Sequence, residues 1–369
     1  MGSGLVPVLW LSGPPGVGKT TVGWEIYTQL VGSGLESGYV DIDQLGMYYP
    51  EPAADPGRHW LKARNLGAVV AGFRAAGARC VVVSGVLDPG HEVPAGAVPD
   101  AVLTVCRLRA DGAELRRRLA ARRLPIGEVE RALREADELD TGAVAGGSVD
   151  TTGLPVADVA RLVRDRTGWP VPSGPNPSPA PVRPAGPDAD GRVLWLCGPT
   201  AAGKSAVGFA VYQKVLRSGR TAAYLDLDQI GFRGPTPAGH PVRAGIMATI
   251  WRTYRQAGAR DLVVVGPVED EAAFAVYSHA LPATRITLLR LHAGRDQLTN
   301  RILSRGQGSN WTQPGDPLVG KPIPHLLRIA DHAAGAAEAF DRTALGHRID
   351  TDHRTVEEVA AHAFRWSTR

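Results

Sequence analysis

Cysteine, methionine and aromatic residues are scarce in this sequence of 369 residues. It contains three cysteines and three methionines, and the aromatic residues make up only 6% of it. Cys80, Cys106 and Cys197 all lie in apolar, strand-like runs, and no C-x-x-C pair is present. This pattern excludes a disulfide framework and a cysteine-based metal cluster. It predicts buried free thiols in a reducing compartment.

A secretion signal and long apolar runs are also missing. Met1–Gly4 has no basic region that leads into an apolar one, and no apolar run reaches the ~20 residues of a membrane helix. We therefore predict a cytoplasmic protein that binds no membrane. The chain has 41 basic and 37 acidic residues, a mild excess that suits an anionic ligand such as a nucleotide. No nucleic-acid-binding module is evident, and the oligomeric state is left open.

Proline, in contrast, is concentrated in one stretch. Thr167–Gly191 contains eight prolines, which neither a helix nor a strand ladder accommodates. Such composition is typical of a semi-extended spacer. We therefore predict a first domain over 1–168, a proline-rich linker over 169–190, and a second domain over 191–369.

Two copies of one motif dominate what remains. Gly13–Thr20 and Gly198–Ser205 both match G-x-x-x-x-G-K-[ST], the phosphate-binding P-loop pattern, and each copy follows an apolar strand-like run. Glycines let the backbone turn sharply and bring N–H groups close to phosphate oxygens. The helix that follows adds its positive N-terminal dipole. Both copies therefore predict a bound nucleotide.

Other segments repeat in the same order. Asp41–Gly46 reads D-I-D-Q-L-G and Asp226–Gly231 reads D-L-D-Q-I-G, at the same distance from their P-loops. The strand Val149–Thr151 recurs as Ile349–Thr351. Predicted strands alternate with predicted helices in both halves. The fold class is therefore α/β, with two tandem P-loop domains that each form a doubly wound parallel sheet flanked by helices.

These motifs together resemble the small-molecule and nucleotide kinase branch of P-loop proteins. The resemblance rests on the P-loop, the strand that ends D-x-D, an L-x-x-R-x-x-x-R helix and a V-D-T strand. Shikimate kinase, gluconate kinase, adenylylsulfate kinase and chloramphenicol phosphotransferase are the most similar families. The resemblance covers both halves apart from the linker, and it implies an ATP- and Mg²⁺-dependent phosphotransferase. The acceptor would be a small hydroxylated metabolite or a nucleotide-like molecule.

The resemblance also implies roles for individual residues. Lys19 and Lys204 would hold the β- and γ-phosphates, and Asp43 and Asp228 would bind the acceptor hydroxyl as base or orienting group. Strand-end capping is the competing interpretation of the aspartates. The expected metal-binding residues are Thr20, Asp41, Ser205 and Asp226. The expected phosphate-binding residues are Gly13, Gly16, Gly18, Lys19, Thr20, Thr21, Gly198, Gly203, Lys204 and Ser205.

Arginines supply the remaining candidates. By resemblance, Arg118 and Arg122 in the first half, and Arg301 and Arg305 in the second, belong to a catalytic lid that stabilises charge on the transferred phosphoryl group. A solvated basic face is the alternative. Arg233 lies in the loop after the second D-x-D and is a candidate for binding an anionic acceptor group. Lys62 and Arg243 occupy matching helix positions and are weaker candidates of the same kind.

Two other functions stay open. One half could be a degenerate kinase that binds nucleotide and regulates the other, because the loops after the two D-x-D segments differ. A group transferase is a lower alternative, since Gly198–Ser205 is similar to the P-loop of tRNA prenyltransferases. The D-S-x-Q-V-Y segment expected in that family is missing.

Overall fold

The structure is a computed structural model of the whole chain. It describes residues 5–86, 96–122, 124–140, 147–169, 190–308 and 316–368. The described residues divide into two compact units. Unit 1 comprises Met1–Gly46, Gly57–Val182 and Gln229–Val242, and unit 2 comprises Met47–Pro56, Arg183–Asp228 and Arg243–Arg369. Each unit thus contains one short segment from the other half of the sequence, which the predicted boundaries at 168 and 191 do not include.

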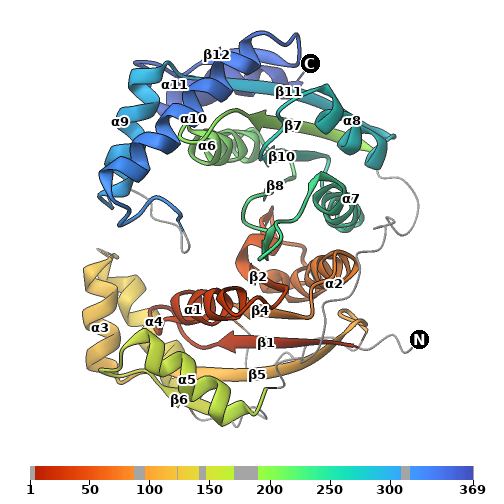
Figure 1. Ribbon diagram of the computed structural model, residues 1–369. Helices are drawn as coiled ribbons and strands as arrows, with labels where there is room; N and C mark the ends of the chain where they lie inside the picture. Colours follow the sequence, from red (N-terminus) through yellow and green to blue (C-terminus); the bar gives the residue numbers. More distant parts are fainter. Residues whose placement is uncertain are drawn as a thin grey trace. The chain divides into compact units, whose positions relative to one another are not determined.

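Each unit is built on a six-stranded sheet (Figure 1). The strands of unit 1 are, in sheet order, β6 (Ser148–Asp150), β5 (Ala101–Arg109), β1 (Val6–Ser12), β4 (Cys80–Ser84), β2 (Ser37–Asp41) and β9 (Phe232–Gly234). Those of unit 2 are β12 (His347–Asp350), β11 (Thr284–His292), β7 (Gly191–Cys197), β10 (Asp261–Val265), β8 (Ala222–Asp226) and β3 (Tyr48–Tyr49). Five strands of each sheet are parallel, and the last is antiparallel to its neighbour.

Helices connect the parallel strands, as the α/β prediction requires. The helices of the first half are α1 (Lys19–Gly32), η1 (Ile42–Gly46), η2 (Pro56–Arg58), α2 (His59–Ala75), α3 (Gly112–Ala121), α4 (Ile126–Asp140) and α5 (Val156–Thr167). Those of the second half are α6 (Lys204–Arg217), α7 (His240–Gln256), α8 (Glu271–Ala280), α9 (Arg295–Gly306), α10 (Ile323–Asp341), α11 (Val356–Phe364) and η3 (Arg365–Thr368). The fold class predicted from the sequence is confirmed in both units.

Strand β2 shows how helices cover both faces of a sheet. Neighbouring residues on a strand point to opposite faces. A Cβ atom on Gly38 would meet Phe73 of α2 at 2.3 Å, while the ring of Tyr39 lies beside Gly23 of α1. Helices α1 and α2 therefore lie on opposite faces of β2. Burial on both faces explains why β4 reads as an unbroken apolar run.

The core of unit 1 reaches past the predicted domain end. Trp169 is 4% exposed and belongs to the buried cluster formed by β1, α1 and α5. The predicted linker began at this residue, so its first position is part of the first core. The rest of the predicted linker, 170–189, lies outside the described residues. Free cysteines occupy the positions expected for them, because Cys80, Cys106 and Cys197 are all buried.

The order of the strands places the P-loops. In each sheet the central strand, β1 or β7, has on one side the third parallel strand of its half and on the other the fourth. The chain thus continues to opposite sides of that strand, which makes its carboxyl end a topological switch point. Ligands of open α/β sheets bind at such points. The P-loops follow β1 and β7 directly, at this end of each sheet.

Candidate active sites

The first P-loop has a backbone that requires glycine. Gly13, Gly16 and Gly18 have φ angles of 137°, 84° and 101°, in the region that strains any residue with a side chain. A Cβ atom on Gly13 would lie 2.3 Å from the carbonyl oxygen of Leu108. The loop therefore folds against β5 only because it has no side chain there. The predicted glycines form one continuous turn into α1.

Helix α1 begins without a capping side chain. Its N-cap is Gly18, and within the described chain its first turn has neither a side-chain cap nor an acidic residue. Helix α6 begins in the same way after Gly203. The first N–H groups of a helix need acceptors, and the helix dipole favours an anion there. Both loops therefore fit a phosphate group at the positions predicted from the motif.

The P-loop lysines lie folded onto their own loops. Lys19 Nζ donates to the carbonyls of Gly13 at 2.7 Å and Pro14 at 2.9 Å. Lys204 Nζ donates to the carbonyls of Gly198 at 2.9 Å and Pro199 at 3.0 Å. Burial lowers the pKa of Lys19, although nearby carboxylates oppose this effect. A phosphate group near the loop would replace carbonyl acceptors with charged ones.

A hydroxyl and a carboxylate meet beside the first P-loop. Thr20 Oγ1 donates to Asp41 Oδ2 at 3.2 Å, and Ser84 Oγ donates to the same oxygen at 3.1 Å. The backbone N–H of Asp43 donates to the other oxygen at 3.0 Å. Burial raises the pKa of Asp41, and the neighbouring charge of Asp43 raises it further. The two predicted metal-binding residues of this half therefore lie together, and their oxygen atoms are ligands of the kind that Mg²⁺ prefers.

The second site repeats this pair with one change. Ser205 Oγ donates to Asp226 Oδ2 at 2.8 Å, and the N–H of Asp228 donates to Oδ1 at 3.0 Å. Val265 pairs with the same strand positions as Ser84, so the second hydroxyl donor is missing. Burial, followed by the charge of Asp228, raises the pKa of Asp226 to about 6. Ser205 and Asp226 are thus placed together as the motif predicts.

The second aspartate of each D-x-D segment lies on a turn after the strand. The strand predicted to end with D-x-D stops two residues earlier, because β2 ends at Asp41 and Asp43 lies in the 3₁₀ helix η1. The side chain of Asp43 is 55% exposed and accepts from Lys62 Nζ at 2.8 Å. Asp228 is 51% exposed, and Arg243 lies 3.7 Å from it. Each candidate acceptor-binding carboxylate therefore lies beside a basic side chain, Lys62 or Arg243, that was only a weaker candidate from the sequence.

Arg118 connects α3 to the P-loop. Its Nη1 donates to the carbonyl of Val17 at 3.1 Å and to Thr151 Oγ1 at 3.0 Å, and Nη2 donates to the carbonyl of Thr151 at 2.9 Å. Its Nε donates to Glu114 at 2.7 Å. These bonds occupy most of the guanidinium donors. Arg118 thus links the P-loop to the residue that follows β6, and we call this set of hydrogen bonds the arginine bracket.

Arg301 repeats this bracket in unit 2. It donates to the carbonyl of Ala201 at 3.3 Å, to Thr351 Oγ1 at 3.0 Å and to the carbonyl of Thr351 at 2.9 Å. Burial lowers the pKa of Arg301. The bracket explains why the V-D-T strand and the arginine helix occur together in both halves. Sequence reasoning had placed both arginines in a mobile lid.

The second arginine of each helix differs between the units. Arg122 lines the cavity of site 1 together with Lys19. Arg305 instead pairs through Nε with Asp316, whose side chain is 1% exposed. Asp316 belongs to the segment 306–324 between α9 and α10, of which 309–315 lies outside the described residues. In the described part, Arg305 is thus engaged in an ion pair with a buried aspartate, while its own side chain is 37% exposed.

Arg233 pairs with a carboxylate of unit 1. It belongs to β9, in unit 1, and its Nη2 lies 2.8 Å from Glu36 Oε2. Both side chains are nearly buried, at 6% and 11% exposure. The structure therefore uses the charge of Arg233 at the edge of the first sheet, whereas the sequence had suggested an acceptor-binding role in the second half.

A cavity of about 230 Å³ marks site 1. Its lining residues are Pro15, Gly16, Gly18, Lys19, Thr20, Thr21, Asp41, Asp43, Gly85, Val86 and Arg122. Nearly all the residues predicted for this half thus line one cavity. Gly85 and Val86 are additions, and they follow β4 at the same end of the sheet.

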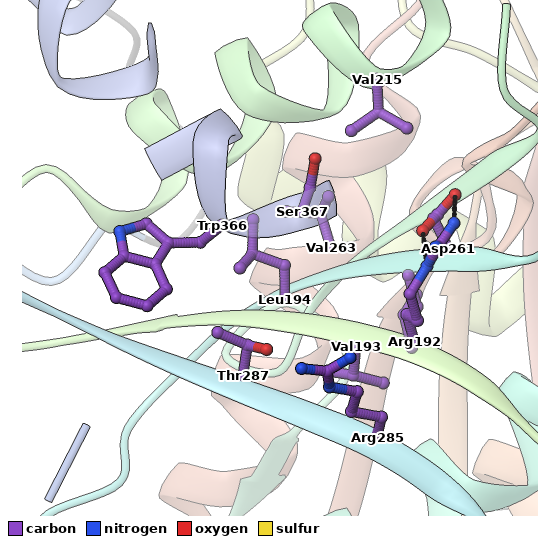
Figure 2. Close-up of a pocket in the computed structure, with 11 residues that line it drawn as sticks. Arg192, Val193, Leu194, Val215, Asp261, Val263, Arg285, Thr287, Trp366 and Ser367 are labelled. Carbon is purple, nitrogen blue, oxygen red and sulfur yellow. Dashed lines mark hydrogen bonds and ion pairs between the residues drawn. The ribbon is translucent and has the colours of Figure 1, made fainter. Parts of the chain in front are cut away.

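A second pocket lies in unit 2, near the beginnings of the strands. Figure 2 shows Leu194, Val263 and Thr287 beside Trp366 and Ser367 of η3. The volume of this pocket is about 10 Å³. This space is no larger than one water molecule needs. It holds no P-loop residue and is a packing gap under η3.

The side chains near the P-loops decide which cations these sites could hold. The described ranges hold no group of three or more histidine, cysteine, aspartate or glutamate side chains arranged as a metal site. A cation at either P-loop would therefore depend on a hydroxyl, one or two carboxylates and the nucleotide itself, which is how Mg²⁺ is usually held.

None of the helices described here has the length and apolarity needed to cross a bilayer.

Comparisons with known proteins give matches only among solved structures. No protein-family model matches the sequence, and no curated protein does. The APS kinase of Mycobacterium tuberculosis, solved with AMPPNP and APS, is 20% identical, covers 50% of this chain and 100% of its own, and has a TM-score of 0.33. A gluconokinase from Sinorhizobium meliloti is 16% identical, covering 50% and 94%, at a TM-score of 0.33.

A shikimate kinase from Acinetobacter baumannii, solved with shikimate, is also similar. It is 21% identical, covers 43% of this chain and 90% of its own, and has a TM-score of 0.28. Three of the families named from the sequence thus recur among the matches. The strand order shows a doubly wound α/β fold in each unit, with a P-loop after the first strand of each half.

Proposed function

We propose that this chain is an ATP- and Mg²⁺-dependent phosphotransferase that acts on an alcohol group of a small metabolite or nucleotide-like acceptor. One observation carries the proposal. In each unit, the hydroxyl after the P-loop lysine hydrogen-bonds a carboxylate at the end of the next parallel strand along the chain, which is buried at Asp226 and partly buried at Asp41. Burying a carboxylate is costly unless it is paired or binds a cation. A pair of this kind, beside an uncapped helix, suits a magnesium nucleotide.

The protein's own groups divide the work of binding. The P-loop N–H groups and Lys19 or Lys204 would hold the phosphates. Thr20 with Asp41, and Ser205 with Asp226, would hold Mg²⁺. When bound, this ion supplies neutralisation of the phosphate charge. Phosphoryl transfer needs mainly positioning and charge stabilisation, which these residues provide without covalent chemistry.

The exposed aspartates would act on the acceptor. Asp43 lines the cavity beside Lys19, so an alcohol bound there can donate its hydroxyl proton to a carboxylate oxygen. Lys62 donates to Oδ1 of Asp43, which fixes the carboxylate plane and leaves Oδ2 for the acceptor. Arg243 has the corresponding position beside Asp228. Arg118 and Arg301 hold the P-loops in place, and Arg122 is the arginine placed to meet phosphate charge.

A specific observation favours a division of labour between the units. The second arginine of unit 2, Arg305, is held by the buried Asp316, whereas Arg122 lines the cavity of unit 1. Unit 1 is therefore the main phosphotransferase in our proposal. Unit 2 binds nucleotide through its intact P-loop and has a regulatory or slower catalytic role.

Calorimetric titration with Mg-ATP tests the proposal directly. The wild type should bind about two nucleotides per chain, and Lys19→Ala and Lys204→Ala should each remove about one. Lys321→Ala, at an exposed lysine, is the matched control and should leave binding unchanged. Absence of Mg-ATP binding at both sites would refute the proposal. Binding without transfer to any member of a panel of sugars, hydroxy acids and nucleosides would favour a nucleotide-dependent switch.

A further inference from the structure

Each sheet is completed by a strand from the other half of the sequence. We call residues 47–56 and 229–242 the exchanged segments, because the first belongs to unit 2 and the second to unit 1. Strand β9 runs antiparallel to β2, with Gly234 opposite Ser37 and Phe232 opposite Tyr39. Strand β3 runs antiparallel to β8, with Tyr48 opposite Ala223. Both pairings protect the edge strand that leads to a candidate active site.

Side chains as well as backbone hold β9 on unit 1. The ring of Phe232 lies 4.9 Å from Trp24 in an edge-to-face contact and 6.1 Å from Tyr39. Gly234 lies so close to α1 that a Cβ atom there would meet Val31 at 2.9 Å. Aromatic contacts and this close approach make β9 part of the unit 1 core rather than a loosely attached strand.

A buried ion pair adds specificity to this contact. Arg233 Nη2 lies 2.8 Å from Glu36, and Thr236 Oγ1 donates to the same carboxylate at 2.6 Å. Arg233 Nη1 also donates to the carbonyl of Thr236 at 2.7 Å. Glu36 and Thr236 are 200 residues apart in sequence. A charge buried at Glu36 is stable only with its partner present, so unit 1 depends on residues of the second half.

The reciprocal contact in unit 2 uses different chemistry. Tyr48 is 3% exposed and stacks on Tyr254 with ring centroids 6.1 Å apart. Its hydroxyl donates to the carbonyl of Ala257, and the carbonyl of Met47 accepts from the N–H of Tyr224 at 2.8 Å. Tyr49, the other residue of β3, is 36% exposed. Unit 2 thus receives the buried ring of Tyr48 from the first half, and Met47 beside it packs against the unit 2 core.

The exchanged segments are continuous with the candidate active sites. Met47 directly follows η1, which contains Asp43, and Gln229 directly follows Asp228. The receiving strands β2 and β8 end at Asp41 and Asp226. The first exchanged segment thus follows the turn that contains Asp43 and pairs with β8, which ends at Asp226. The second follows Asp228 and pairs with β2, which ends at Asp41.

We propose that β2 and β8 are binding surfaces for the exchanged segments, each specific for the segment of the opposite half, so that each sheet requires residues of both halves of the chain. The specificity comes from the chemistry of each surface. The edge of β2 presents a carboxylate at Glu36 for an arginine, and the edge of β8 lies beside Tyr254, which receives an aromatic ring. Neither unit completes its sheet from its own half of the chain.

Hydrogen–deuterium exchange of the full chain tests this proposal, and it needs no nucleotide. Arg233→Met should raise exchange about tenfold or more in peptides covering 36–41 and leave 222–226 unchanged. Tyr48→Ala should do the reverse. Tyr49→Ala is the matched control and should alter neither peptide beyond its local effect.

A double variant keeps the test decisive if Arg233→Met proves unstable. Adding Glu36→Gln removes the unpaired buried charge, so the double variant should regain most of the protection over 36–41. Loosening of 222–226 by Arg233→Met, or of 36–41 by Tyr48→Ala, would show that each segment pairs within its own half and would overturn the proposal. Since Mg-ATP is absent throughout, failure here would not bear on the proposed phosphotransferase activity.

Discussion

The two candidate sites share their phosphate side and differ on the other side. Both have a lysine on two loop carbonyls, a hydroxyl–carboxylate pair and an arginine bracket. They differ at Arg122 against Arg305 and at Ser84 against Val265. Backbone N–H groups make most of the contacts in a phosphate-binding loop, so the loop backbone must keep one shape and few sequences can form it. The acceptor side depends on single side chains, so one substitution changes it.

A smaller difference lies inside the P-loops. Gly16 has φ of 84°, and the corresponding residue of the second loop, Ala201, has φ of 66°. A residue with a Cβ atom in this left-handed region costs about 1–2 kcal/mol. The second loop thus keeps its backbone shape at some cost in stability. Retention of this shape in both loops is consistent with phosphate binding in both.

The largest expected effect separates the units by catalysis. Asp43→Asn should lower kcat about 10²–10⁴-fold with unchanged Mg-ATP affinity, because it removes the group that accepts the acceptor's proton. Asp228→Asn should lower kcat much less if unit 1 is the main phosphotransferase. Steady-state kinetics and calorimetry measure the two quantities. Equal losses in both variants would show two equivalent active sites and end the division of labour we propose.

The next effect tests the buried carboxylate of unit 2. Its pKa of about 6 lies above the ordinary value of 3.8, so Asp226 binds its proton more tightly in the folded chain. Folding stability contributed by this group therefore falls as the pH rises from about 4 to about 6. Relative to wild type, Asp226→Asn should gain on the order of 2–3 kcal/mol between pH 4 and pH 7.

Urea unfolding at both pH values measures this change. Asp296→Asn is the matched control, because that residue is exposed on α9 and should show little relative change. Added Mg²⁺ nucleotide should oppose the effect in wild type but not in the Asn variant. A pH-independent difference between wild type and Asp226→Asn would mean that the carboxylate is ionised in both states.

Removal of a bracket arginine should have a similar or somewhat smaller effect in both units. Arg118→Lys and Arg301→Lys each lose the forked bonds to Thr151 or Thr351 and to the P-loop carbonyl. We expect a loss of about 2–3 kcal/mol, since hydrogen bonds from charged groups contribute ~1.5–3 kcal/mol. Thermal unfolding measures the loss. A variant that keeps its stability but loses turnover would restore the lid role predicted from the sequence.

The smallest effect concerns the left-handed P-loop position. Gly16→Ala should cost on the order of 1–2 kcal/mol, because its Cβ atom would also lie 2.9 Å from Leu119. Ala201→Gly should change stability by about 1 kcal/mol or less, as relief of strain offsets lost contacts. Differential scanning calorimetry measures both shifts. A larger loss from Ala201→Gly than from Gly16→Ala would contradict the strain we assign to the second loop.

Several parts of both sites could be predicted because they are local in sequence. The P-loop glycines, the lysines and the D-x-D aspartates lie within short motifs whose spacing determines which groups meet. The pairing of Thr20 with Asp41 was predictable as well, because parallel strands place their carboxyl ends at one edge. The end of β2 was less so. Asp43 turns into η1 because the N–H of this residue bonds back to Asp41, a local competition that periodicity does not report.

Other residues depended on partners far away in the chain. Arg122 and Arg305 occupy corresponding positions, yet one lines the cavity of site 1 and the other binds Asp316. Arg233 looked like an anion-binding residue until Glu36 was found beside it. A basic residue reveals a charge but not the group that neutralises it.

The sequence by itself determined that this protein has two P-loop α/β halves, each with a phosphate cradle and a D-x-D turn, because these features arise from short-range backbone chemistry. Only the tertiary structure decided which half completes each sheet. Strands β3 (Tyr48–Tyr49) and β9 (Phe232–Gly234) are both short edge strands, and either could pair with β2 or β8 by backbone hydrogen bonds alone. The choice rests on long-range side-chain contacts, of Arg233 with Glu36 and of Tyr48 with Tyr254, that no local pattern encodes.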